Sequence, residues 1–178
     1  MSSSNSRLQI KGLLRILRYI NLLPENNEAL WYTHHDMNEN GDYNSIQWLL
    51  KDSIAIVKDA LDACADTGLP LMIQVDYTHS KIIGEKGMIG TVGIADLGFH
   101  FHPIAHDLNK SENTNDSDHL IKTAALLLII LGYKVEIHGK KFAIMDGSKQ
   151  LKNASERNGF IPKRCGVHIT REAGVRPR

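Results

Sequence analysis

The chain has 178 residues, of which 42% are hydrophobic and 23% charged, and its formal net charge is +1. This composition is typical of a globular protein, and the length fits one domain. The longest apolar run, 124–131, is far shorter than the roughly 20 residues of a membrane-spanning helix, and no secretory signal is visible. The only cysteines, Cys64 and Cys165, form no CxxC pair. They therefore indicate a reducing compartment rather than a thiolate zinc site, with Cys64 in the core.

The charges are distributed unevenly along the chain. Residues 1–20 contain four basic residues and no acidic one, and residues 149–178 carry a formal charge of +6. The segment between them, 21–148, therefore carries a formal charge of −9. Basic ends around an acidic body favour an anionic partner: phospholipid headgroups, nucleic acid, or the acidic body of a neighbouring copy.

The first half of the chain predicts two helices separated by a turn-rich segment. Cations recur at helical spacing over 7–20, although a strand also fits there. Residues 24–44 are rich in turn formers. Apolar residues at helical spacing over 45–67 predict the clearest helix of the chain, which should end at Gly68, shortly before Pro70.

The second half predicts strands around one further helix. Alternation predicts strands over 71–78 and 97–102, and the glycine-rich segment 82–95 fits a hairpin or a bulged strand. Residues 109–117 should form a polar loop, and Ser117 should begin a helix that ends at Gly132. The segments 133–138 and 141–146 indicate a hairpin around Gly139-Lys140, and beyond 147 we expect a tail with one short element near Ile161 or His168.

The order of these elements predicts an α+β fold. Helices separated by runs of strands favour an antiparallel sheet with two main helices packed on it and flexible basic termini. We therefore expect a basic N-terminal arm over 1–20, a single domain over 21–147 and a basic C-terminal tail over 148–178.

Histidines form the best candidate for a metal site. His100, His102 and His106, followed by Asp107, have a spacing that suits zinc or iron if a turn brings His106 back. The favoured alternative is an amphipathic strand with a histidine-rich polar face, so no metal or other cofactor is expected. His34-His35-Asp36 is better explained by an exposed loop.

Other patterns argue against catalysis. The glycines at 84, 87, 90 and 93 are not followed by a phosphate-binding GK[ST]. Cys165 lies in a basic segment that would lower its pKa, but a cysteine in a tail is more often incidental. No catalytic residue is therefore expected.

The basic ends are the candidate binding sites. In 7–20 the cations could lie on lipid phosphates with the aliphatic residues in the headgroup boundary, or the segment could be a core element with a solvated face. The C-terminal cations could contact phosphate without reading sequence, or simply keep the tail soluble. The predicted membrane-binding residues are Arg7, Lys11, Arg15 and Arg18. Those predicted to bind nucleic acid or a neighbouring copy are Lys163, Arg164, Arg171, Arg176 and Arg178.

A helix ending in Leu-Gly, followed by YKVEIHGKKFAIMD over 133–146, resembles the C-terminal end of rhabdovirus matrix proteins, in particular those of plant cytorhabdoviruses. The resemblance covers roughly 45–146 in the order of its elements. No PPxY or PTAP motif is present. It implies a structural protein that polymerises, binds the inner leaflet of a membrane and condenses a ribonucleoprotein.

The function expected from these patterns is that of a non-enzymatic, matrix-like assembly protein. Its partners would be further copies of itself, anionic membrane and nucleocapsid RNA, without a small-molecule substrate. It would reside in the virion and the host cytoplasm, peripheral on membranes, neither secreted nor transmembrane. The alternatives are a small metal-dependent hydrolase that uses the three histidines and a nucleic-acid-binding regulator.

Overall fold

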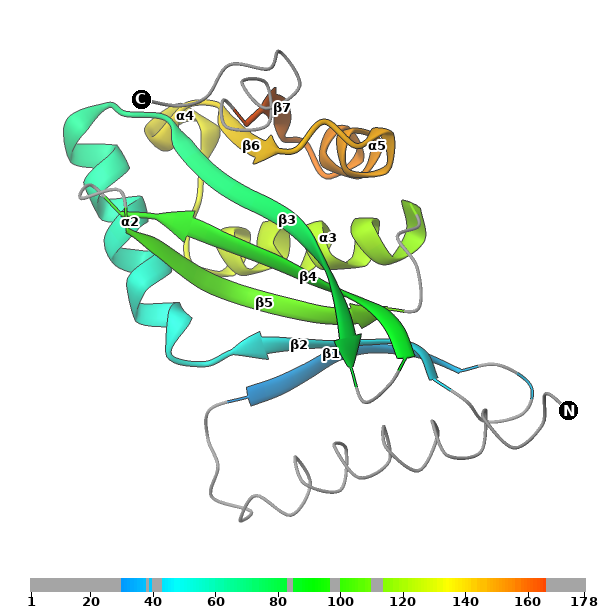
Figure 1. Ribbon diagram of the computed structural model, residues 1–178. Helices are drawn as coiled ribbons and strands as arrows, with labels where there is room; N and C mark the ends of the chain where they lie inside the picture. Colours follow the sequence, from blue (N-terminus) through cyan, green and yellow to red (C-terminus); the bar gives the residue numbers. More distant parts are fainter. Residues whose placement is uncertain are drawn as a thin grey trace, which may run out of the picture.

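The computed structural model describes residues 30–37, 39, 43–82, 85–96, 100–109 and 114–165. The predicted N-terminal arm and its helix lie outside this part of the chain. Within it, seven strands form one sheet in the order β1-β2-β5-β4-β3-β6-β7 (Figure 1). The strands are β1 (Leu30–Met37), β2 (Tyr43–Leu50), β3 (Leu71–Ile82), β4 (Glu85–Ala95), β5 (Phe101–Asn109), β6 (Lys141–Met145) and β7 (Ile161–Arg164). The helices are α2 (Ser53–Thr67), α3 (Thr114–Ile130), α4 (Val135–His138) and α5 (Lys149–Arg157).

The predicted α+β class and the packing of helices on the sheet are confirmed. Strands β3, β4 and β5 form an antiparallel meander that β2 and β1 extend, also antiparallel. On the other side of β3, strands β6 and β7 join in parallel. The sheet is therefore mixed. Parallel neighbours need crossover connections, and here these connections run through α3 and α5.

One face of the sheet, which we call the core face, holds the hydrophobic core. Leu71, Ile73 and Val75 alternate inward from β3, as their period of two predicts. They pack in one cluster with buried side chains of α2, α3 and α5. The opposite face, called the open face, carries side chains that are half-buried at its centre: Trp48, Gln74, Ile89, Thr91, His106, Leu108, Phe142 and Ile144.

The predicted helix over 45–67 is wrong in its first part. Residues 43–50 form β2, and the helix begins only at Ser53. Ser45 and Gln47 point inward despite being polar, and Gln47 is held by a hydrogen bond from the Thr123 hydroxyl. The expected end is confirmed, since Gly68 has a positive φ of 68° and its N–H binds the carbonyl of Cys64.

One segment predicted as a loop contains a strand, and one predicted strand is longer than expected. Residues 30–37 form β1, so His34-His35-Asp36 belongs to a strand rather than to a loop. The strand expected to stop at Pro103 continues to Asn109. Pro103 is tolerated because it lies at a register shift, where a missing N–H interrupts the ladder least. The helix expected from Ser117 begins at Thr114.

The hairpin predicted over 133–146 does not form. Residues 135–138 make one helical turn, and β6 pairs in parallel with β3 instead. The segment predicted as a tail is folded as far as Cys165, because it supplies α5 and β7, and Leu151, Ala154 and Phe160 are buried in the core. None of the described helices has the length and apolar character needed to cross a membrane.

Candidate functional site

Two aspartates stand level with each other on neighbouring parallel strands. In the β3–β6 ladder Gln74 pairs with Ile144, and Asp76 and Asp146 each follow two residues later. Asp76 is exposed on the open face, between the buried Val75 and Tyr77, and the half-buried Asp146 directly follows the end of β6. Adjacent strands are spaced about 4.8 Å apart. The two carboxylates therefore belong to neighbouring strands at the same end of their shared ladder.

The location of this pair is one where α/β sheets bind ligands. From β3 the chain turns to β4 on one side, whereas β6 joins β3 on the other side after a long crossover. In open α/β sheets, ligands commonly bind outside the carboxyl ends of the parallel strands at such a switch in strand order. Asp146 directly follows the end of β6 at Met145. The aspartate pair therefore lies at the switch point of the sheet.

The Asp146 side chain is oriented by its own turn. Its Oδ1 accepts a hydrogen bond of 2.8 Å from the backbone N–H of Ser148. Ser148 in turn caps α5, with its hydroxyl accepting from the N–H of Leu151. A carboxylate at the start of a helix is favoured by the positive end of the helix dipole. Within the described part of the chain, no hydrogen bond or ion pair engages the Asp76 carboxylate.

Two cations end the neighbouring strand. Met145 pairs with Arg164 in the β6–β7 ladder, so Lys163 and Arg164 lie at the same end of the sheet as Asp146. The Arg164 side chain runs against the Gly147 backbone: a Cβ on Gly147, whose φ is 106°, would be 2.6 Å from Arg164 Nε. The Lys163 ammonium lies 5.7 Å from the centre of the Phe142 ring. Lys163 pairs with Ile144 and so lies on the open face, whereas Arg164 pairs with the buried Met145. We call Asp76, Asp146 and Lys163 together the switch-point site.

These groups are suited to phosphate chemistry. Carboxylate oxygens are the ligands that Mg²⁺ prefers, and Mg²⁺ is commonly held by one or two carboxylates together with substrate phosphates. Exposed lysine and arginine side chains next to such an ion can neutralise further phosphate oxygens. The site therefore combines hard anionic ligands for a metal with cations for an anionic substrate.

The predicted histidine cluster is only partly assembled. His100 and His102 both contact Asp96, at 3.2 Å from Nδ1 of His100 and 2.9 Å from Nε2 of His102 to Oδ2. His106 lies elsewhere on the open face, where its Nδ1 is 2.9 Å from the Thr91 hydroxyl. Burial lowers the pKa of His106, which favours its neutral form. Among the described residues, no group of three potential ligands is arranged to hold a metal ion.

Asp107, which follows the last of these histidines, points to the core face. It is 1% exposed and accepts hydrogen bonds from the Tyr77 hydroxyl, the Gly90 N–H and the Asn109 amide, all between 2.7 and 2.9 Å. Burial raises its pKa to about 6, although the three hydrogen bonds act in the opposite direction. Burial and the Asp107 carboxylate also raise the pKa of Tyr77. Asp107 is thus a structural group rather than a metal ligand.

The sequence interpretation missed Asp76 and Asp146. Each looks like an ordinary polar residue at or next to an alternating strand. The available signal is that Asp146 precedes Gly147 and a helix cap, which marks a turn between a strand and a helix. Of the predicted partner-binding residues, Lys163 and Arg164 are both exposed, but only Lys163 lies on the open face with the site. Those at 7, 11, 15, 18, 171, 176 and 178 lie outside the described residues.

Comparison with known proteins gives no family. No family model and no curated protein match the chain. Among solved structures, a chain from the simian T-cell lymphotropic virus intasome bound to the PP2A subunit B56 gamma is similar over 60% of this chain and 38% of its own, with 14% identity and a TM-score of 0.37. The HTLV-2 integrase catalytic core domain in complex with magnesium is similar over 60% of this chain and 66% of its own, with 18% identity and a TM-score of 0.37. These likenesses are too low to bear on function.

Proposed function

We propose that this protein is a divalent-metal-dependent phosphoryl-transfer enzyme that acts on the phosphodiester backbone of nucleic acid. The observation that carries this proposal is the placement of Asp76 and Asp146 level on adjacent parallel strands at the switch point of the sheet. Cations at the end of β7 next to this pair favour a polyanionic substrate over a neutral one.

Each group has a distinct role in this proposal. Asp76 and Asp146 would hold Mg²⁺ or Mn²⁺, and the turn to Ser148 keeps the Asp146 carboxylate in a fixed orientation. A metal ion bound there would neutralise charge on a phosphate and activate a water or hydroxyl nucleophile. Lys163 would contact a phosphate that flanks the reacting one, without reading base sequence.

The expectation of a non-enzymatic matrix protein stays a prediction. Its membrane contacts and most of its C-terminal cations lie outside the described residues. The alternative of a metal-dependent hydrolase is retained as a class of reaction, but its proposed ligands change. The aspartate pair replaces the three histidines because His106 lies apart from His100 and His102.

The test is cleavage or strand joining by the full chain on labelled DNA and RNA oligonucleotides, single-stranded and double-stranded, with Mg²⁺ or Mn²⁺. Asp76→Asn and Asp146→Asn should each lower the rate at least about a hundredfold, since either change removes a charge that holds the metal. Asp62→Asn, at an exposed position on α2, is the matched control and should leave the rate unchanged. Equal activity of all three variants would refute the assignment.

Metal binding supplies a second readout that does not depend on finding the right substrate. Titration calorimetry with Mn²⁺ should show a site that is lost in Asp76→Asn and kept in Asp62→Asn. Unchanged Mn²⁺ binding in both Asp76→Asn and Asp146→Asn would contradict the proposal.

A further inference from the structure

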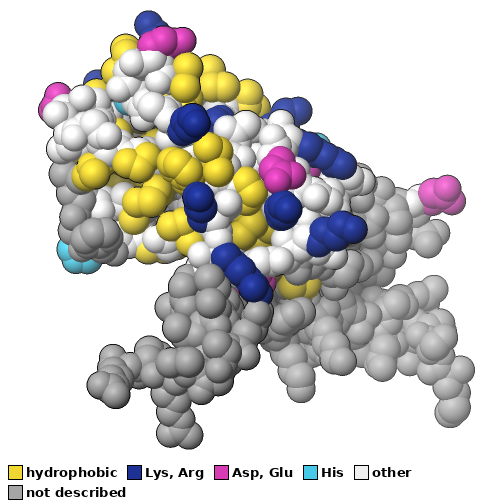
Figure 2. All heavy atoms as spheres, turned by 90° about the horizontal axis from the view of Figure 1, so that it is seen from above, with side chains coloured by type: hydrophobic (Ala, Val, Ile, Leu, Met, Phe, Trp, Pro, Cys, Tyr) yellow, Lys and Arg dark blue, Asp and Glu magenta, His cyan; other side chains and the backbone are white. Residues whose placement is uncertain are grey.

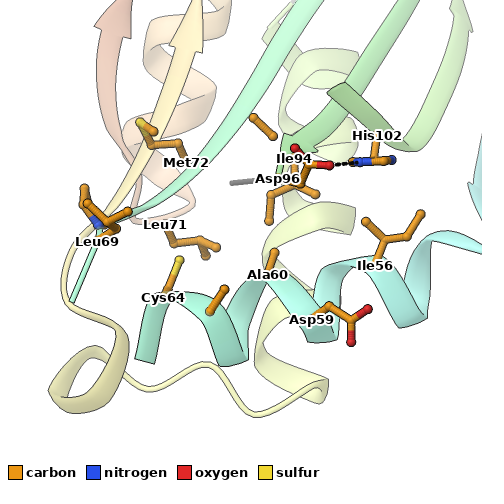
Figure 3. Close-up of a pocket in the computed structure, with 13 residues that line it drawn as sticks. Ile56, Asp59, Ala60, Cys64, Leu69, Leu71, Met72, Ile94, Asp96 and His102 are labelled. Atoms are coloured by element: carbon orange, nitrogen blue, oxygen red, sulfur yellow. Dashed lines mark hydrogen bonds and ion pairs between the residues drawn. The ribbon is translucent and has the colours of Figure 1, made fainter. Parts of the chain in front are cut away.

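An apolar pocket lies at the end of the sheet where β3 and β5 begin. Its volume is about 530 Å³, and it is bounded by α2 on one side and by the ends of β3, β4 and β5 on the other (Figure 3). Cys64, Leu71 and Ile94 form part of its lining, and the Cys64 sulfur points into it. Leu69 and Met72, also in the lining, are 52% and 36% exposed.

The apolar character continues around this end of the molecule. The exposed large hydrophobic side chains of the described residues gather where α3 ends, α4 lies and β3 and β5 begin: Leu69, Met72, Phe101, Leu126, Ile129, Ile130, Val135 and Ile137. Figure 2 shows a cluster of hydrophobic side chains on one face of the molecule, with lysine and arginine side chains around and among them. An apolar surface of this kind usually marks a binding site.

The helix beside the pocket is acidic. Asp59 lines the pocket, and Asp52 and Asp66 lie seven residues before and after it. A spacing of seven residues is close to two helical turns, so these three carboxylates follow one side of α2 at intervals of about 10 Å. Asp96 adds a fourth carboxylate at the pocket. The site therefore combines an apolar hollow with a row of negative charges.

The basic segment 7–20 of the same chain has the complementary pattern. Its sequence, RLQIKGLLRILRYI, contains seven leucine and isoleucine residues and four cations. Lys11 and Arg18 are seven residues apart, which is the spacing of Asp59 and Asp66. If this segment is helical, as its periodicity predicts, it can pack alongside α2 in a parallel or an antiparallel direction. Lys11 and Arg18 would then lie opposite Asp59 and Asp66, because both pairs have the same spacing along a helix.

The chain is long enough to reach the pocket within one molecule. Leu30 at the start of β1 pairs with Leu50, which is three residues before α2 begins at Ser53. The nine residues 21–29 that precede Leu30 can span up to roughly 30 Å. The helix α2 itself is only about 22 Å long. Segment 7–20 can therefore lie along α2 of its own copy.

We propose that residues 7–20 bind in this pocket of the same molecule, with leucine and isoleucine side chains in the hollow and Lys11 and Arg18 against Asp59 and Asp66. The docked segment closes an apolar opening and neutralises part of the acidic body. This inference is independent of the proposed phosphoryl transfer, because it concerns the opposite end of β3 and none of the residues of the switch-point site.

The Cys64 thiol serves as a native probe. In a Cys165→Ser background, reaction of Cys64 with a maleimide should be about five to ten times faster when Arg7, Lys11, Arg15 and Arg18 are all changed to Glu. Salt at 0.5 M should also speed the reaction in the protein with its natural cations. Lys149→Glu with Lys152→Glu, on the distant α5, is the control and should not change the rate. Equal rates in all variants would overturn the proposal.

A crosslink tests whether segment 7–20 lies at the pocket without using the charge-reversed protein, whose folding could differ. Leu14→Cys in the Cys165→Ser background should form a disulfide with Cys64 on mild oxidation, at a rate independent of protein concentration. Ser3→Cys is the matched control and should crosslink much less. Absence of the disulfide overturns the proposal, and a crosslink that appears only between two molecules overturns its assignment to the same copy.

Discussion

Asp76 and Asp107 show how two faces of one sheet give the same side chain opposite roles. Asp76 is exposed on the open face, next to Asp146 and the end of β7. Asp107 is buried on the core face, and its partner Tyr77 is the residue that directly follows Asp76 in the chain. The exposed carboxylate is accessible to solvent, whereas three hydrogen bonds hold the buried one in place. The environment, rather than the residue type, separates an accessible carboxylate from a structural one.

The largest expected effect tests whether the core face extends into the predicted tail. Leu151 on α5 is fully buried, so Leu151→Ala should destabilise the protein by about 3 kcal/mol through lost burial and a residual cavity. Lys152→Ala, at the exposed neighbouring position, should change stability by less than about 0.5 kcal/mol. Urea unfolding followed by circular dichroism measures both. Equal stabilities would mean that α5 does not belong to the core.

A somewhat smaller effect is expected at Gly90, where β4 passes the buried carboxylate. A Cβ there would collide with Asp107 Oδ1 and would lie 2.5 Å from Tyr77 Cε1. Gly90→Ala should therefore cost about 2–3 kcal/mol, because neither buried side chain can move aside easily. Thr91→Ala, on the open face of the same strand, is the comparison and should cost less. A Gly90→Ala protein as stable as the wild type would contradict this packing.

The third prediction concerns the effect of pH on the buried Asp107. Because the pKa of Asp107 is raised from 3.8 to about 6, the folded state binds this proton more tightly than the unfolded chain does. The contribution of this group to stability is therefore greatest below about pH 4, falls as the pH rises and is lost above about pH 6.

Asp107→Asn should remove that decline and stabilise the protein at pH 7.5 by roughly 1–2 kcal/mol. The new amide can be accommodated if the Asn109 side chain turns over, since Asn109 Oδ1 has no hydrogen-bond partner within the described structure. Thermal melts of Asp107→Asn and of the wild type from pH 4 to pH 8 check this. A parallel pH dependence for Asp107→Asn and the wild type would show that Asp107 is not the titrating group.

The smallest effect should come from a single phosphate contact on the open face. Lys163→Gln should weaken nucleic-acid binding about two- to fivefold at moderate salt and reduce the slope of log affinity against log salt by about one. Lys122→Gln, an exposed position on α3, should change neither quantity. Fluorescence anisotropy across a series of salt concentrations gives both. An unchanged slope in Lys163→Gln would remove Lys163 from the proposed binding site.

The sequence predicted local structure where one pattern was dominant. The alternation over 71–78 and the glycine stop at Gly68 were read correctly because each depends on neighbouring residues. Residues 45–50 were misread because their apolar residues fit helical spacing, whereas the inward positions of Ser45 and Gln47 depend on partners such as Thr123. The α+β class followed from the order of elements, although the parallel pairing of β6 did not.

The switch-point site depended on information that local patterns do not contain. Asp76 and Asp146 become neighbours only when β6 pairs with β3, and the segment containing β6 equally fitted a hairpin with its predecessor. Lys163 and Arg164 were selected by charge alone, and the structure places them at the end of β7. The histidines at 100, 102 and 106 suggested a site because they are close in sequence. On an extended strand, which rises about 3.3 Å per residue, His106 lies too far along the chain to join the other two.

The parallel attachment of β6 and β7 also affects how the protein is made. The meander of β3, β4 and β5 has contacts close in sequence and can form while the chain is still being synthesised. Asp146 follows Asp76 by 70 residues, and its strand must wait for α3 and α4. At about 5–20 residues per second, several seconds separate the emergence of the two aspartates from the ribosome. A nascent chain therefore does not bring Asp76 and Asp146 together until β6 has joined the sheet.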